Sequence, residues 1–385
     1  MSLELKVFFL HLVRLGISHT DVAVIKDNID WVALKSLAES QGLSAVVLDG
    51  LNTLHGSGAI VHNSMPQEMR LEWIGEVLQN YEARYKAYEK AISSLARWHN
   101  RNGYKMMVLK GYACAMNWPN PAHRPCGDID IWQFGEQKSA DAALLNLNDN
   151  HNEKLESLIG EKSSKYFSGN PISIDSSHHH HTVFRWQGFT VENHYDFLNV
   201  HHHRSNREME GILKELGKDD SNTIMVCGET VFLPSANLHA LFLLRHSMSN
   251  FASTGFQLRQ LLDWGFFVEK HKTEVDWEWL ERQLENFGMK RLYNVFNAIC
   301  VWDLGFDESI FPIVQFESEL KARVLNDILS PEFSEKETGG FFSRAAFKYR
   351  RWKANAWKHE LCFRESMWSA FWSGVKGHLI KPSMI

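Results

Sequence analysis

The sequence predicts an α+β protein in which a small mixed sheet of about four strands is flanked by helical N- and C-terminal regions. From Gln67 to Trp98, apolar residues recur at steps of three and four, the period of an amphipathic helix. Between residues 106 and 197, short apolar runs and strict alternation replace that period, which is typical of strands. We therefore expect a helical region at 1–66, a core domain at 67–200 and a helical domain at 201–385.

The first elements are a short amphipathic helix at residues 1–16 and the long helix that begins at Gln67. Asn102-Gly103 ends this helix with residues that tolerate a left-handed backbone. The apolar run 106–109 then predicts a buried strand that ends at a turn, Lys110-Gly111.

The later part of the sequence shows the period of strands in some segments and the period of helices in others. Residues 127–132 alternate as a strand, and two further strand candidates are joined by Gln187-Gly188 in the manner of a hairpin. The polar stretch 148–177 predicts an irregular loop, and the chain from Arg207 onward is mostly helical in pattern. The remaining expected elements are a helix at 136–147, strands at 180–186 and 189–197, and helices at 235–246 and 257–271.

Composition excludes several classes of protein. The 385 residues include 41 Lys and Arg against 46 Asp and Glu, a net charge of −5, so we expect no stable nucleic-acid partner. No apolar run approaches the roughly 20 residues that span a bilayer, and the N-terminus lacks a signal-peptide cleavage site. The five cysteines form no CxxC pair and fit reduced thiols. We expect a cytoplasmic protein that does not span a membrane.

Two aspartates on the strand 127–132 are the strongest candidates for chemistry. Asp128 and Asp130 alternate with Ile129 and Ile131, so both carboxylates share one face, about 7 Å apart. Their repulsion is about 2–3 kcal/mol at an effective dielectric near 20, and a divalent cation would remove it. Oxygen-only ligands favour Mg²⁺. The alternative is two solvated acids on an edge strand.

Cationic and acidic groups flank this pair. Lys110 and Arg124 supply positive charge, and Gly111 allows close backbone approach to a phosphate at a strand-to-helix turn. Downstream, alternation places Glu192 and His194 on one face of the later strand, with Asp196 two residues further on. The sequence thus offers three carboxylates around a metal pair. Lys110 is equally compatible with an ordinary solvated lysine.

These motifs, in this order, resemble the nucleotidyltransferase fold of the DNA polymerase beta superfamily. The run Lys110-Gly111, Arg124, Gly127–Ile131 and Val191–His194 is similar to an uncharacterised bacterial nucleotidyltransferase family, over residues from about 70 to 265. The resemblance implies a nucleotidyltransferase core at 67–200. It implies these roles: Asp128, Asp130 and Glu192 as catalytic residues and metal ligands, and Lys110, Gly111, Tyr112, Arg124 and His194 as contacts to the nucleotide, although Tyr112 stands where the superfamily usually has Gly or Ser.

The activity implied is transfer of a nucleoside monophosphate from a nucleoside triphosphate such as ATP, with two Mg²⁺ ions and release of pyrophosphate. The acceptor would be an unknown small molecule or protein. One alternative is a catalytically inactive nucleotide-binding or scaffold protein. Another is a protein-modifying, AMPylating transferase of antitoxin type. The three acids favour activity, and nothing in the sequence separates the two kinds of acceptor.

Two further patterns invite other interpretations. The histidine runs 178–181 and 201–203 alternate between faces if they lie on strands, so no more than two of a run converge easily, and no Cys or Glu-x-x-His completes a zinc site. Residues 341–381 interleave basic and aromatic side chains, a pattern compatible with peripheral membrane or anion contact. Packing of the aromatics into a core, with basic stems over them, is the favoured interpretation.

Overall fold

The computed structural model describes residues 2–20, 29–56, 64–146, 172–201, 203–253, 255–312, 315–333, 341–370 and 372. The chain forms two compact units. The first comprises residues 1–82, 117–125 and 244–367, and the second residues 83–116, 126–243 and 368–385. Most of the expected polar loop at 148–177 lies outside the described residues.

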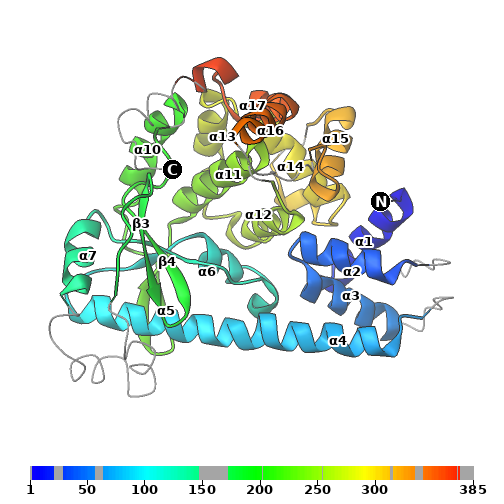
Figure 1. Cartoon of the computed structure of the whole chain (residues 1–385), viewed down its shortest axis with the longest axis horizontal. Coiled ribbons are helices and arrows are strands. Elements are labelled where there is room, and N and C mark those ends of the chain that lie inside the picture. The colour runs from blue at the N-terminus through cyan, green and yellow to red at the C-terminus, as the bar shows by residue number, and fades with distance from the viewer. Residues whose placement is uncertain are drawn as a thin grey trace. The chain divides into compact units, whose positions relative to one another are not determined.

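The first unit is helical. Its helices α1 and α3 pack at close range through two glycines, because a Cβ at Gly16 would lie 2.0 Å from the Val46 oxygen and one at Gly50 would lie 2.0 Å from the Leu12 oxygen. The elements of this unit are α1 (Leu3–Gly16), α2 (Trp31–Ser40), α3 (Ser44–Gly56), α4 (Gln67–Val77), η2 (Pro121–His123), α12 (Leu258–His271), α13 (Trp277–Asn286), α14 (Lys290–Trp302), η3 (Glu308–Ile310), α15 (Ser318–Leu329), α16 (Phe341–Ala354) and α17 (Ala356–Cys362) (Figure 1).

The second unit is built on a mixed sheet of the order β3-β4-β2-β1-β6-β5. β2 runs parallel to β4 and antiparallel to β1, and β1 runs parallel to β6. Its elements are α5 (Arg84–Arg101), β1 (Met107–Val108), α6 (Lys110–Ala115), β2 (Ile129–Trp132), α7 (Gln137–Leu145), β3 (His181–Trp186), β4 (Phe189–His194), α10 (Arg204–Leu216), β5 (Thr223–Val226) and β6 (Glu229–Phe232) (Figure 1).

Two helical segments cross the boundary between the units. The expected helix from Gln67 is confirmed, but a π-helical segment, η1 (Leu78–Ala83), separates α4 from α5. Gly103 follows α5 with a φ of 80°, as the sequence predicted. α11 (Ala236–Ala252) is the second crossing segment.

The sheet is larger than the sequence predicted. The four expected strands are present, but β5 and β6 form a further hairpin in a region expected to be mostly helical. Cys227 and Gly228 join these strands with φ values of 47° and 88°, the left-handed pair of a tight hairpin turn. The prediction of about four strands was therefore too low.

The expected α+β fold is otherwise confirmed. On the face of the sheet opposite Asp130, Ile129, Ile131 and Val191 are fully buried. α5 packs there, since the indole nitrogen of Trp186 donates to the Ser94 hydroxyl at 2.8 Å. Within the described part of the chain, no helix has the length and apolar character needed to cross a bilayer.

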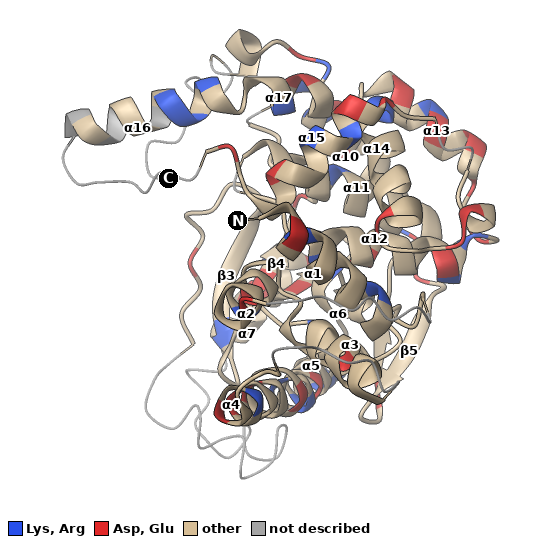
Figure 2. Cartoon of the chain, turned by 90° about the vertical axis from the view of Figure 1, so that its right-hand side faces the viewer, with Lys and Arg blue, Asp and Glu red and all other residues tan. Residues whose placement is uncertain are grey.

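The C-terminal basic-aromatic segment divides between core and surface. In the first unit, Leu361 and Phe363 are buried, and the guanidinium of Arg245 donates to the Cys362 carbonyl at 3.0 Å. Toward the C-terminal end of α16, Arg351 and Lys353 lie in the last turn (blue in Figure 2), and Tyr349 is 61% exposed. The part of the predicted segment beyond residue 372 lies outside the described residues.

Candidate active site

The sheet brings acidic and imidazole groups from three strands onto one face. The parallel pairing of β2 with β4 sets Asp130 opposite Glu192 and Trp132 opposite His194. The antiparallel pairing of β3 with β4 sets His181 opposite His194. Because paired residues project to the same side of a sheet, the side chains of Asp130, Glu192, His194 and His181 share a face.

Lys110, the first residue of α6, reaches the same carboxylates from the end of β1. The backbone N–H of Leu109 donates to the Asp130 carbonyl at 2.9 Å. This bond places the next residue, Lys110 at the start of α6, beside Asp130. Its Nζ lies 2.7 Å from Asp130 Oδ1, and the two side chains are only 16% and 9% exposed. Burial alone would raise the pKa of Asp130, but the ammonium of Lys110 and the imidazole of His194 outweigh it and hold that pKa well below its usual range.

The environment of Lys110 is correspondingly acidic. Burial would lower its pKa, yet the charges of Asp130 and Glu192 raise it above the ordinary lysine value. Lys110 is therefore a charged, mostly buried ammonium beside the carboxylates. The alternative of an ordinary solvated lysine is excluded by its 16% exposure.

His194 lies between two acceptors. Its Nδ1 is 3.2 Å from the Asp196 carbonyl oxygen and its Nε2 is 3.1 Å from Asp130 Oδ1. Both neighbours are hydrogen-bond acceptors, so a protonated ring donates to both, whereas a neutral ring with its proton on Nδ1 leaves a lone pair on Nε2. Although burial lowers the pKa of His194, the hydrogen bond to Asp130 and the nearby Glu192 raise it overall.

The remaining carboxylates respond differently to their surroundings. Burial would raise the pKa of Glu192, but His194 and Lys110 lower it, so this side chain stays ionised. Asp128, just before β2, has a raised pKa because of burial and then the charges of Glu192 and Asp130. The repulsion expected from the sequence is therefore present at Asp128.

The donor set fits a divalent cation. Asp130 and Glu192 face each other across β2 and β4, and Asp128, just before β2, is within range of the charges of both. Ligand atoms of Asp130, Glu192 and His194 lie within 4.8 Å of one another. Carboxylate oxygens suit Mg²⁺, which binds few protein ligands and retains water. Asp130 and Glu192 are the carboxylates of this group, and metal binding by Asp128 stays a prediction.

Gly111 and Tyr112, two other predicted residues, contact side chains of α5. Tyr88 of α5 donates its hydroxyl to the Asp128 carbonyl at 2.7 Å, and a Cβ on Gly111 would lie 2.8 Å from that hydroxyl. Tyr112 is buried, and its hydroxyl donates to Glu89 at 3.0 Å. Gly111 thus leaves space for the hydroxyl of Tyr88, which binds the backbone carbonyl of Asp128.

Arg124 lies in the first unit. Its Nε and one terminal nitrogen donate to the two carboxylate oxygens of Asp263 at 2.7 and 2.9 Å. The indole of Trp118 donates to the same carboxylate at 2.9 Å. The predicted contact of Arg124 with a phosphate stays a prediction.

Asp196 is separated from the acid cluster. β4 ends at His194, and the Asp196 carboxylate accepts from Lys214 of α10. Glu192 is the acid of this segment that faces Asp130, as its register requires.

Sequence reasoning missed His180 and His181 as members of this face. Their ring centroids lie 5.4 and 5.2 Å from that of His194. The histidine run was the available signal, and two of its members do converge, but the third imidazole comes from β4. The alternation rule alone cannot show this, because it does not predict which strands are neighbours.

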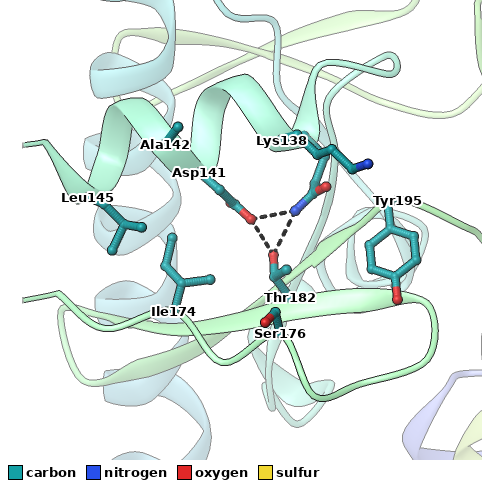
Figure 3. Close-up of a pocket in the computed structure, with 9 residues that line it drawn as sticks. Lys138, Asp141, Ala142, Leu145, Ile174, Ser176, Thr182 and Tyr195 are labelled. Carbon is teal, nitrogen blue, oxygen red and sulfur yellow. Dashed lines mark hydrogen bonds between the residues drawn. The ribbon is translucent and has the colours of Figure 1, made fainter. Parts of the chain in front are cut away.

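A pocket of about 580 Å³ lies against α7 and β3 (Figure 3). Its floor is a polar network in which Thr182 and Gln137 donate to the carboxylate of Asp141. Asn193 donates to the other oxygen of that carboxylate at 2.7 Å. Thr182 and Asn193 alternate with the residues of the acid cluster, so this network lies on the opposite face of the sheet.

The fold and the site together define a class of mixed α+β proteins with acidic side chains on adjacent strands of the sheet. A family model described as "Uncharacterised nucleotidyltransferase" matches residues 27–302. The chain belongs to this nucleotidyltransferase family, as the sequence motifs indicated. No curated protein and no solved structure shows a significant match.

Proposed function

We propose that the chain transfers a nucleoside monophosphate from a nucleoside triphosphate to an acceptor, with Mg²⁺ held by Asp128, Asp130 and Glu192. The observation that carries this proposal is the pairing of Asp130 on β2 with Glu192 on β4 beside a buried ammonium, Lys110, with Asp128 just before β2. Membership of a nucleotidyltransferase family supports the same reaction class. The nucleotide base and the acceptor follow from neither observation.

The reaction balances without an external oxidant or reductant. A lone pair of the acceptor oxygen forms a bond to the α-phosphorus as the bond to the bridging oxygen breaks, and pyrophosphate leaves. Bound Mg²⁺ would lower the pKa of the acceptor and neutralise charge on the phosphates. The lowered pKa of Glu192 keeps its carboxylate ionised, as both metal binding and acceptance of the proton require.

Two cationic groups would act on the nucleotide. Lys110 and His194 both donate to Asp130, so their positive charges lie where phosphates of a metal-bound triphosphate would approach. Gly111 and Tyr112 at the start of α6 are the other proposed contacts to the nucleotide within this unit. For Gly111 and Tyr112 the contacts described above support an indirect role, through Tyr88 and Glu89.

The test uses each of the four triphosphates labelled at the α-phosphate, with Mg²⁺, in the presence and absence of a cell extract. Labelled small molecules would identify a small acceptor, and labelled protein bands would identify a protein-modifying transferase. Glu192→Gln should lower the rate of label transfer about 100-fold or more while keeping much of the triphosphate affinity.

Asp196→Asn is the matched control, because this acid lies four residues after Glu192 and is paired with Lys214. Transfer that survives Glu192→Gln but collapses in Asp196→Asn would contradict the assignment of the third acid. Binding of triphosphate with no transfer to any acceptor would favour the inactive nucleotide-binding alternative.

A further inference from the structure

Three imidazoles gather at the edge of the acid cluster. The ring centroids of His180 and His181 are 4.3 Å apart. The centroid of His194 lies 5.4 Å from that of His180 and 5.2 Å from that of His181. One ligand nitrogen from each of the three lies within 4.8 Å of the other two. The bond length of about 2.0–2.1 Å from zinc to nitrogen implies nitrogens roughly 3.4 Å apart in a tetrahedral site. Small side-chain rotations would therefore bring all three onto one ion.

The backbone explains why neighbours in sequence converge here. His181 is the first residue of β3 and pairs with His194 of β4. His180 precedes the strand, so the alternation of a strand does not force its side chain to the opposite face. Its carbonyl accepts from the backbone N–H groups of Tyr195 and Asp196 at 3.0 and 3.1 Å, which fixes its position beside β4.

The nitrogens are arranged as those of metal-binding histidines are. Nδ1 of His194 donates to the Asp196 carbonyl, which orients the ring with Nε2 toward the cluster, the usual support of a histidine ligand. The side chain of His181 is 8% exposed, and its Nδ1 has no hydrogen-bond partner among the residues that the structure describes. Oε2 of Glu192 lies 3.9 Å from this Nδ1 and 3.7 Å from Nε2 of His194, and Asp130 Oδ1 lies 3.1 Å from the same Nε2.

We propose that His180, His181 and His194 form a binding site for a transition-metal ion of the Zn²⁺ type, with Glu192 as the adjacent oxygen ligand. Three imidazoles and one carboxylate are a donor set that zinc accepts and that Mg²⁺, which prefers oxygen ligands, does not. The site shares His194 and Glu192 with the acid cluster. It does not rest on the proposed function, because ion binding is measurable without any nucleotide.

The experiment uses the untagged chain, stripped of metal with a chelator and assayed at pH 7. Calorimetry with Zn²⁺ should show one tight site, and Co²⁺ should give the visible absorption of a four-coordinate ion. His181→Ala and His180→Ala should each weaken Zn²⁺ binding by at least about tenfold, since even the loss of a supporting contact to a ligand costs 10–100-fold. His201→Ala is the matched control, since His201 lies outside this group of ligand atoms, and it should bind as the wild type does.

A second readout separates this site from the proposed function. Mg²⁺-dependent triphosphate binding should persist in His180→Ala, whereas Asp128→Asn should lose it and keep Zn²⁺ binding. Thermal melts confirm folding, and His180→Ala, at a half-buried position, carries the test if His181→Ala fails to fold. Equal Zn²⁺ affinity in wild type and His180→Ala, or a wild type with no tight Zn²⁺ site, would overturn the proposal.

Discussion

A substitution at Gly111 tests how the fold supports the acid strand. The glycine lies inside α6, where alanine is normally the better helix former by about 1 kcal/mol. A Cβ there would lie 2.8 Å from the hydroxyl of Tyr88, a side chain that is 1% exposed and has little room to move. The clash also displaces the 2.7 Å hydrogen bond from Tyr88 to Asp128. Gly111→Ala should therefore lower the free energy of unfolding by about 1–3 kcal/mol, the usual cost of overpacking.

The clash and the hydrogen bond involve the same oxygen atom, so a double-mutant cycle isolates it. Tyr88→Phe alone should cost about 0.5–1.5 kcal/mol, the net value of one hydrogen bond. In the Tyr88→Phe background the clashing oxygen is gone, so Gly111→Ala should become nearly neutral or stabilising. Urea unfolding of the four proteins should give a coupling of about 1 kcal/mol or more. Additive effects, or a stabilising Gly111→Ala in the wild-type background, would refute the packing argument.

The remaining predictions concern stability and use the same denaturant assay. Burial lowers the pKa of His99 to about 4, so protons bind the unfolded chain preferentially and stability falls as pH drops below 6.5. The wild type should lose about 2 kcal/mol of its free energy of unfolding between pH 7 and pH 5 through His99, and His99→Gln should not show this loss. The same dependence of stability on pH in both proteins would be contrary evidence. Asp263→Asn should destabilise by about 3–5 kcal/mol by leaving Arg124 buried without its carboxylate; weakened triphosphate binding in a folded variant would instead support the predicted phosphate contact of Arg124. A chain ending at Gly340 should melt well below the full chain, because it lacks the buried Leu361 and Phe363; an unchanged melting temperature would mark the segment as peripheral.

Local patterns in the sequence were sufficient for most of the core. The alternation around Ile129 and Ile131 predicted a strand with apolar residues behind, and both are fully buried in β2. The hairpin of β5 and β6 was missed although its two-residue turn, Cys227-Gly228, and its β-branched flanks were visible. The helical patterns on either side of it dominated the interpretation of that region.

Local sequence patterns could not predict side-chain contacts between residues that lie far apart in the sequence. Asp128 and Asp130 look equivalent, yet Asp130 is buried between two cations while Asp128 is more exposed. Arg124 stands four residues before Asp128 in sequence, but its guanidinium binds Asp263, 139 residues away. Spacing along the chain predicts which residues share a strand, and not the partner that tertiary packing supplies.

Magnesium-dependent triphosphate binding by Asp128→Asn tests the central claim most directly. This substitution leaves the buried pair of Lys110 with Asp130 intact and removes a carboxylate whose pKa is raised by burial and then by the charges of Glu192 and Asp130, so the fold should remain stable. Calorimetry with each triphosphate, with and without Mg²⁺, should show that the wild type binds at least one of them in a Mg²⁺-dependent manner and that Asp128→Asn does not. Equal, Mg²⁺-dependent affinity in both proteins would contradict the assignment of this cluster as the nucleotidyltransferase site.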